Sequence, residues 1–202
     1  QSRSSAASDV YKRQMKYYAI KNYSEHITEE NFMLEMMDLN DNRWLINYGM
    51  QLEESFDYIN FKMYGEEKLF FDQDIMTPYF GIYLLSERFQ DVILQNSKIS
   101  EGIQLLSFKL FNTDDKEIKH NYKIINFLQT EECINWEKSY FKIRDEAKKS
   151  YIFLDTVFDP LKIATLTKDW ICVDSEKSIF VCEEIKKEWQ KNTLLTVCFW
   201  QK

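Results

Sequence analysis

Apolar residues change their spacing partway through one stretch in the middle of the chain. The segment "IYLLSERFQDVI" (82–93) starts with consecutive apolar residues, as in a buried strand. It then places Phe89 and Ile93 four positions apart, as on one face of a helix. Another apolar run follows at 103–111. The pattern therefore predicts a strand-helix-strand unit.

The same change of spacing recurs near the end of the chain. The segment "IFVCEEIKKEW" (179–189) begins with apolar, strand-like residues and continues with Ile185 and Trp189 on the inner face of a predicted helix. A further apolar run follows at 194–200. We therefore predict a second strand-helix-strand unit.

Alternation of apolar and polar residues predicts further strands. They are expected at "KYYAIK" after Met15, at "DYINFKMY" with Ile59, Phe61 and Met63 on one side, at "GIQLLSFKLF" with Leu106, Phe108 and Leu110 on one side, and at "NYKIINFLQ" with Ile125 and Phe127. In contrast, "TEENFMLEMMD" (28–38) has a capping residue at Thr28, two glutamates in its first turn and apolar residues at helical spacing. This segment is predicted to be a short helix.

Together these elements predict an α+β fold, a mostly antiparallel sheet with a few helices packed on it. At 202 residues the chain has the size of one domain. Its first fourteen residues, "QSRSSAASDVYKRQ", resemble translated sequencing-adapter read-through, and a disordered native tail is the alternative. We expect residues 1–14 to be a tail and residues 15–202 to form a single domain.

Ser86 lies where the first predicted strand gives way to its helix, which is where α/β hydrolases place a nucleophilic serine. Such a nucleophile normally has glycine neighbours because the turn is sharp, whereas Leu85 and Glu87 flank Ser86. A serine at this position also caps the free amides of a helix. We therefore expect Ser86 to cap the helix, with nucleophilic chemistry as the alternative.

The charge of the chain limits its classes of partner. It has 33 acidic and 26 basic residues and a net charge of -7, which opposes binding to nucleic acids and to anionic membranes. No apolar run reaches the roughly 18 residues of a membrane span, and no charged-then-apolar leader is recognisable. We expect a cytoplasmic protein with a cationic protein partner.

Few residues offer cofactor or metal chemistry. The four glycines are at least sixteen positions apart, which excludes the glycine-rich loops that hold phosphates and dinucleotides. The four cysteines lack C-x-x-C spacing, and His26 and His120 are isolated from them. We expect buried free thiols, no cofactor and no metal site.

Acidic and aromatic residues supply the candidate binding site. Glu53, Glu54, Asp72 and Asp74 have few basic neighbours and flank a predicted hairpin, so they form the preferred acidic patch for a cationic partner. Ordinary solvated surface is the alternative for these carboxylates. Trp136, in "CINWEKS", is the candidate aromatic anchor, and core packing is its alternative.

Several segments are similar, in their order and spacing, to the immunity protein 11 family of bacterial polymorphic toxin systems. They are "YLLSERFQDVI" (83–93), "NYKIINFLQTEECINWEKS" (121–139) and "IFVCEEIKKEW" (179–189) with the strand that follows it. The segment "RWLINYGMQLEES" (43–55) fits the early Trp and Gly region of the family. The resemblance covers nearly the whole chain from Met15. It implies a small cytoplasmic protein that neutralises a toxin by binding it and that has no catalytic residues.

We therefore expect a non-catalytic immunity protein whose negative potential attracts a cationic toxin domain and whose aromatic-centred patch then holds it. An enzyme of unassigned chemistry and an interaction module unrelated to toxins are the alternatives. An enzyme requires a pocket with strained or titration-shifted groups, whereas a binding protein requires an exposed acidic or apolar face.

Overall fold

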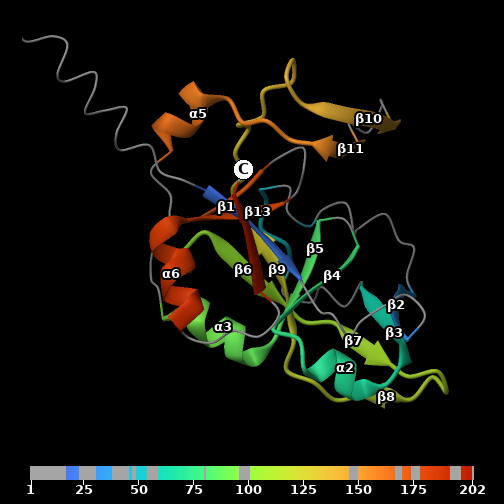
Figure 1. The fold of residues 1–202 in the computed structure, drawn as a ribbon. Helices are drawn as coiled ribbons and strands as arrows, with labels where there is room; N and C mark the ends of the chain where they lie inside the picture. Colours follow the sequence, from blue (N-terminus) through green and yellow to red (C-terminus); the bar gives the residue numbers. More distant parts are fainter. Residues whose placement is uncertain are drawn as a thin grey trace, which may run out of the picture.

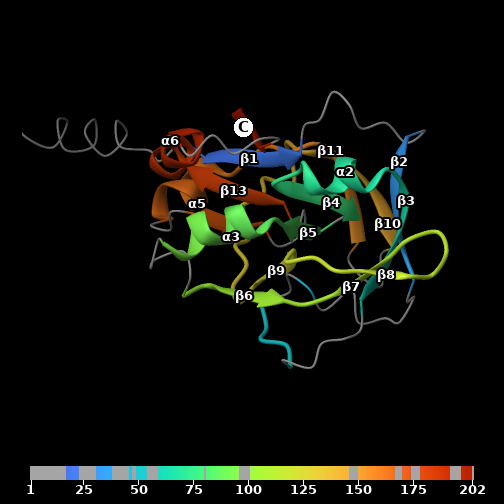
Figure 2. The same cartoon turned by 90° about the horizontal axis from the view of Figure 1, so that it is seen from below.

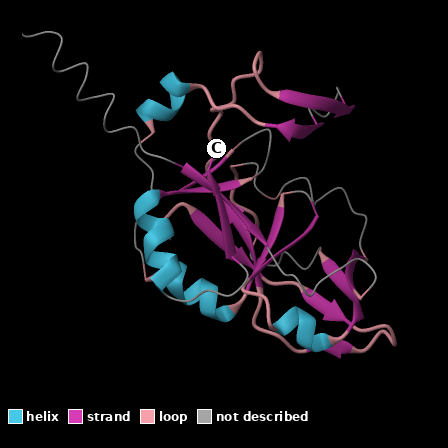
Figure 3. Ribbon diagram, viewed as in Figure 1, coloured by secondary structure: helices cyan, strands magenta, loops and turns pink. Residues whose placement is uncertain are grey.

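The computed structural model confirms the predicted α+β class, with strands in several largely antiparallel sheets and helices beside them (Figures 1 and 3). It describes residues 17–22, 31–37, 46, 49–53, 59–79, 81–95, 101–145, 150–166, 170–173, 178–191 and 197–201. The predicted tail, residues 1–14, lies outside the described residues. No helix in the described part is both long enough and apolar enough to cross a membrane.

The first predicted strand-helix-strand unit is confirmed and forms part of a four-stranded sheet. Its elements are β4 (Ile75–Tyr79), β5 (Ile82–Leu85), α3 (Glu87–Leu94), β6 (Ile103–Leu106) and β9 (Lys123–Phe127). The strands lie in the order β4-β5-β9-β6, and every neighbouring pair is antiparallel. Strand β9 therefore lies between the two strands that α3 connects.

The second predicted unit is also confirmed, and its sheet has the same arrangement. Its elements are β1 (Tyr17–Asn22), β12 (Trp170–Cys172), β13 (Ile179–Cys182), α6 (Glu183–Lys191) and β14 (Val197–Gln201). The order is β12-β13-β1-β14, again with antiparallel neighbours, and Figure 2 shows β1 alongside β13. Here the strand between the two that flank the helix is β1, from the opposite end of the sequence.

The helices of the two units pack against each other on one side of the molecule (Figure 1). The rings of Phe89 on α3 and Trp189 on α6 meet edge to face, with their centroids 4.8 Å apart. Ile93 and Ile185 are buried on the same inner faces. The four-residue spacing that predicted both helices therefore marks the surface that joins them.

The sheet β4-β5-β9-β6 is buried on both faces, because it separates two apolar clusters. Leu85 and Ile125 belong to the cluster shared with α3, α6 and the β1 sheet. Leu84 and Ile124, one position earlier in each strand, belong to the second cluster. Alternate side chains of a strand point to opposite faces, so a sheet covered on both sides needs continuous apolar runs such as "IYLL".

The second cluster is closed by a third sheet. Its elements are β2 (Phe32–Met36), β3 (Asn60–Gly65), β7 (Lys109–Phe111) and β8 (Glu117–Ile118), with the short helix α2 (Glu67–Phe71) following β3. The order is β2-β3-β7-β8, and β3 and β7 run parallel. Gly65 has a φ of 110°, and a Cβ there would collide with the backbone oxygen of Asn31, so this position requires glycine.

The helix predicted over residues 28–38 is wrong, because this segment contains strand β2. Phe32, Leu34 and Met36 are buried and Met33 is exposed, which is the period of a strand. Pairing with β3 along all five residues supplies the backbone hydrogen bonds that a helix would have made internally. Met33 is apolar although it faces solvent, so the apolar and polar residues of this segment do not alternate strictly. Its sequence pattern therefore resembled that of a helix.

Two further predictions need correction. The single strand expected over residues 103–111 is two strands, β6 and β7, which lie in different sheets. The hairpin expected between the acidic residues is absent from the described chain, because α2 separates β3 from β4 and these two strands belong to different sheets. The strands expected around residues 17–22, 59–63 and 123–127 are confirmed as β1, β3 and β9.

A two-stranded ribbon, which we name the arm, stands apart from the sheets in Figure 1. It consists of β10 (Tyr140–Asp145) and β11 (Ser150–Asp155), and helix α5 (Pro160–Thr165) follows it. At its base, the two chain segments that lead into and out of the arm are joined by backbone hydrogen bonds, from Asn135 N to Val157 O and from Asp159 N to Cys133 O, both 2.8 Å.

Candidate functional site

An open groove of about 860 Å³ lies where α2, the start of α3 and the segment after β8 meet. Its lining consists of Phe71, Asp72, Asp74, residues 86–88, Phe108 and residues 117–122. Four segments from different parts of the sequence contribute to this lining. The groove therefore depends on the tertiary fold and has no single-segment motif.

Ser86 occupies the turn between β5 and α3 and caps the helix, as the sequence predicts. Its Oγ accepts a hydrogen bond from the backbone N of Phe89 (3.2 Å) and donates one to Oδ1 of Asp74 (3.0 Å). The backbone N of Ser86 also donates to the backbone O of Asp74 (2.9 Å). These contacts fix the start of α3 against the start of β4.

Asp74 is buried and forms the centre of a polar network. Its side chain accepts two hydrogen bonds from Arg88, from Nε at 3.1 Å and from Nη2 at 2.5 Å, besides the one from Ser86. A buried carboxylate is tolerated when a two-pronged guanidinium contact and further donors compensate its lost hydration. Asp74, a predicted contact residue, therefore has its carboxylate engaged within the chain.

Tyr122 and His120 also line the groove. The Tyr122 hydroxyl donates to the backbone O of Gln73 (2.5 Å), and burial, followed by the charges of Asp74 and Asp72, raises the pKa of Tyr122 above its ordinary value. Burial, followed by the positive charge of Lys123, lowers the pKa of His120. Its Nδ1 accepts a hydrogen bond from the backbone N of Tyr122 (3.2 Å). Burial therefore favours the neutral form of both groups.

The reactive side chains of the groove are occupied by structural contacts. Ser86 is bound to Asp74 and to the helix start, and no hydrogen bond among the described residues joins it to His120. The arrangement therefore lacks the nucleophile-base contact of a hydrolase. Within the described ranges, no three His, Cys, Asp or Glu side chains lie close enough together to hold a metal ion.

The rim of the groove carries exposed acidic groups. Asp72 follows α2, Glu87 opens α3 and Glu117 lies in β8, and all three are exposed. Glu87 accepts a hydrogen bond from Nδ2 of Asn121 (3.0 Å). In the described part of the chain, no ion pair involves Asp72 or Glu117. These two carboxylates are therefore accessible to a cationic group from outside.

The arm is held together by an aromatic cluster around Trp136. The Trp136 ring meets Phe141 edge to face at 5.2 Å and Tyr151 at 4.9 Å between centroids, and Phe153 lies at 5.6 Å. Trp136 is partly buried, and its Nε1 donates to Oε1 of Glu132 at 3.4 Å. This residue, predicted as an anchor for a partner, packs against the aromatic rings of the arm and against the main apolar cluster.

Large apolar side chains on and beside the arm are exposed. Tyr140 is 64% exposed and Ile143 58% on β10, Leu154 is 53% exposed on β11, and Leu161 is 79% exposed on α5. A two-stranded ribbon has no second layer to cover both its faces, so apolar residues remain in contact with water. The arm is therefore the second candidate surface.

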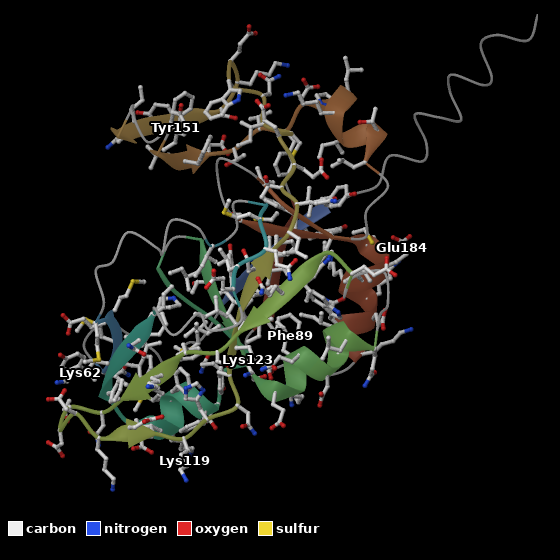
Figure 4. The ribbon with its side chains drawn as sticks, turned by 180° about the vertical axis from the view of Figure 1, so that it is seen from behind. Lys62, Phe89, Lys119, Lys123, Tyr151 and Glu184 are labelled. Atoms are coloured by element: carbon white, nitrogen blue, oxygen red, sulfur yellow. The ribbon has the colours of Figure 1, made fainter. Side chains whose placement is uncertain are left out.

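The predicted contact residues do not form one patch. Asp72 and Asp74 both line the groove, while Glu53 is exposed beside Leu52, whose backbone N and O bond to the Gln104 side chain on β6. Glu54 lies outside the described residues. The arm, against which Trp136 packs, lies at the end opposite the groove, as the labels of Tyr151 and Lys119 show in Figure 4.

Sequence reasoning missed the exposed residues of the arm and the 117–122 wall of the groove. The alternation in "YFKIRD" and "SYIFLD" was available as a signal for the two strands of the arm. The groove wall had no comparable signal, because its role depends on long-range packing. No protein-family model matches the chain, and no curated protein has a significant sequence match to it.

Proposed function

We propose that this chain is a protein-binding protein that neutralises a toxin domain by occupying it, without catalysing a reaction. The observation that carries the proposal is the concentration of the most exposed large apolar side chains in one part of the chain, the arm and α5. Among the described residues, the three most exposed large apolar side chains are Leu161, Tyr140 and Ile143. Exposed apolar groups that gather on one surface mark sites of protein-protein contact.

The arm offers a partner backbone groups as well as side chains. Among the described strands, β10 and β11 pair only with each other, so each has an outer edge with backbone N–H and C=O groups that point away from the ribbon. Such edges add strands from other proteins readily. The packing of Trp136 beneath the ribbon stiffens this surface, which lowers the entropy lost on binding.

Two features of the sequence favour a toxin as the partner. The net charge of -7 speeds the encounter with a cationic domain. The resemblance to the immunity protein 11 family supplies the class of partner, and the cytoplasm of the producing cell is then the place of action. Long-range attraction brings the toxin close, and the apolar residues of the arm supply the short-range contact.

The groove favours binding over chemistry. The hydroxyl of Ser86, the carboxylate of Asp74 and the imidazole of His120 each make hydrogen bonds that hold the groove together. A nucleophile or general base must instead reach the substrate with its reactive atom. The proposal therefore assigns these side chains a structural role.

A survival assay tests the proposal. The full chain is expressed in bacteria together with the toxin domain encoded beside its gene, and colonies are counted against an empty vector. We expect rescue and a complex that co-purifies. The variant with Tyr140→Ser, Ile143→Ser and Leu154→Ser should lose both, whereas Met33→Ser, at another exposed apolar site, on β2, should keep both.

Circular dichroism of both variants establishes that each is folded before the comparison is made. A folded triple variant that still rescues the cells would remove the arm from the proposal. A toxin that kills in the presence of the soluble, folded chain would remove the proposal for that pair. A toxin recovered cleaved or covalently modified would favour an enzyme instead.

A further inference from the structure

We infer that the groove between α2, α3 and β8 receives a basic side chain, with arginine as the best fit, from the surface of the protein partner. The inference rests on the proposed function for the statement that the partner is a protein. The chemistry of the side chain is inferred from the lining of the groove, independently of any toxin.

The charges of the lining favour a cation. Four carboxylates and two cationic side chains line the groove, and His120 is neutral, so the lining has a net charge of about -2. Asp74 and Arg88 compensate each other in their two-pronged contact. The accessible charges that remain are mainly carboxylates, at Asp72, Glu87 and Glu117, with Lys119 as the opposing cation.

The floor of the groove suits the apolar stem of a long basic side chain. Phe71, Phe108 and Tyr122 contribute aromatic rings to the lining, and the Phe71 ring is 43% exposed. Arginine and lysine bury their methylene stems along apolar surface and keep their charged ends near polar groups. Guanidinium also stacks on aromatic faces and bonds carboxylates in pairs, which favours arginine over lysine.

The same protein already binds one of its own cations with this combination of groups. At the start of α6, Nζ of Lys186 lies 3.6 Å from the centre of the Tyr18 ring. A hydrogen bond joins the Tyr18 hydroxyl to the Glu183 carboxylate beside it. There an aromatic ring next to a carboxylate receives a basic side chain from within the chain. The groove presents rings and carboxylates of the same kind to the outside.

The volume and charge of the groove argue against other occupants. At about 860 Å³ the groove exceeds the needs of one ion and accommodates a side chain with part of its backbone. Its excess of carboxylates repels a phosphate or another anion. A basic residue on a protein surface is therefore the occupant that matches both the charge and the size.

Nuclear magnetic resonance titration of the full chain tests the inference without any toxin. The probe is N-acetyl-arginine amide, and N-acetyl-citrulline amide, which has nearly the same shape and no charge, is its control. We expect saturable shifts at the backbone amides of Arg88 and Asn121 with the arginine probe only. Added sodium chloride should weaken the binding, because exposed charges are screened.

A matched pair of variants locates the binding. The double variant Asp72→Asn with Glu117→Gln keeps the shape of the rim and should weaken the arginine probe at least tenfold. The double variant Asp91→Asn with Glu101→Gln removes the same charge from exposed positions outside the lining and should leave the affinity within twofold. Equal weakening by both pairs would reduce the effect to net charge and overturn the inference.

Other outcomes are also decisive. Equal shifts with citrulline, shifts centred away from the groove, stronger binding of inorganic phosphate, or no saturable shift up to the solubility limit would each overturn the inference. If the chain rescues cells but does not bind the arginine probe, the proposed function stands and this inference is rejected. If the chain binds the arginine probe through Asp72 and Glu117 but does not rescue cells, the inference about the groove stands and the proposed toxin partner is rejected.

Discussion

The two strand-helix-strand units have the same strand order and use their helix starts differently. In the first unit, Ser86 separates β5 from α3 and caps the helix, and a charged groove lies in front of it. In the second unit, α6 begins at Glu183 directly after β13, and Glu183 is bound by Tyr18 and lies 3.5 Å from Lys187. At the second helix start Glu183 therefore has partners within the chain, while the rim of the first groove has carboxylates, at Asp72 and Glu117, without an ion pair among the described residues.

This difference shows that the topology of a unit does not determine its function. Both units bury the same kind of strand and helix face, and in both sheets another strand lies between the two that flank the helix. The contrast arises from a few side chains at the junction and from the neighbour that faces it. In the first unit that neighbour is the 117–122 segment, which the third sheet positions.

The largest expected effect comes from breaking the contact that joins the two units. Phe89→Ala should lower the free energy of unfolding by about 3–5 kcal/mol, because it empties a buried site against Trp189. Urea unfolding followed by tryptophan fluorescence measures the loss. Leu94→Ala, at an exposed position of the same helix, should change it by less than about 0.5 kcal/mol. Similar losses for both variants would contradict a joining role for Phe89.

The next effect separates the buried ion pair of the first unit from the exposed one of the second. Arg88→Ala leaves the buried Asp74 carboxylate without its main partner and should cost about 1–3 kcal/mol, reduced because Arg88 itself is half exposed. Lys187→Ala, which removes the pair with Glu183 on α6, should leave the urea midpoint unchanged. Equal urea midpoints for the two variants would contradict the prediction, because the buried pair would then stabilise the fold no more than the exposed one.

A smaller effect concerns the cap that only the first junction has. Ser86→Ala should cost about 1 kcal/mol, since the amide of Phe89 and the carboxylate of Asp74 each lose a hydrogen bond. Ser86→Thr should recover most of it. Both variants should still rescue cells from the toxin, because Ser86 has a structural role. A folded Ser86→Ala protein without rescue would revive the nucleophile hypothesis.

The smallest effect is a pH dependence that belongs to the first unit. Burial lowers the pKa of His120 in the folded chain, so the unfolded chain binds the proton more readily. The stabilising contribution is fully present above the unfolded value of about 6.5 and is lost as pH falls toward the lower folded value. Thermal midpoints between pH 7.5 and 5 should fall less steeply in His120→Gln. Parallel curves for the two proteins would exclude this contribution.

The sequence predicted the elements whose burial follows one period. Phe89 and Ile93 on α3, and Phe61 and Met63 around β3, show in their spacing the face that is buried. The β2 segment was predicted wrongly because its exposed Met33 is as apolar as its buried neighbours. Local spacing therefore predicts an element only where the solvent-facing residues are polar.

The candidate site was less predictable because its contacts are distant in sequence. Asp72 and Asp74 are close along the chain, and both line the groove. The partner of Asp74 is Arg88, fourteen positions further on, and the lining also includes His120, which no local pattern connects to either. Contacts between residues that are distant in the sequence build such a site. The spacing of apolar residues in a single sequence does not indicate which distant residues will meet.

The position of β1 between β13 and β14 has a consequence for synthesis on the ribosome. The first unit takes all its strands from residues 75–127, so its sheet can close soon after that stretch emerges. β1 must wait for partners that lie at residues 179–182 and 197–201. At typical elongation rates this delay is roughly ten to forty seconds. During that time Tyr17, Tyr18 and Ile20, all buried in the finished protein, remain exposed to chaperones and to other nascent chains.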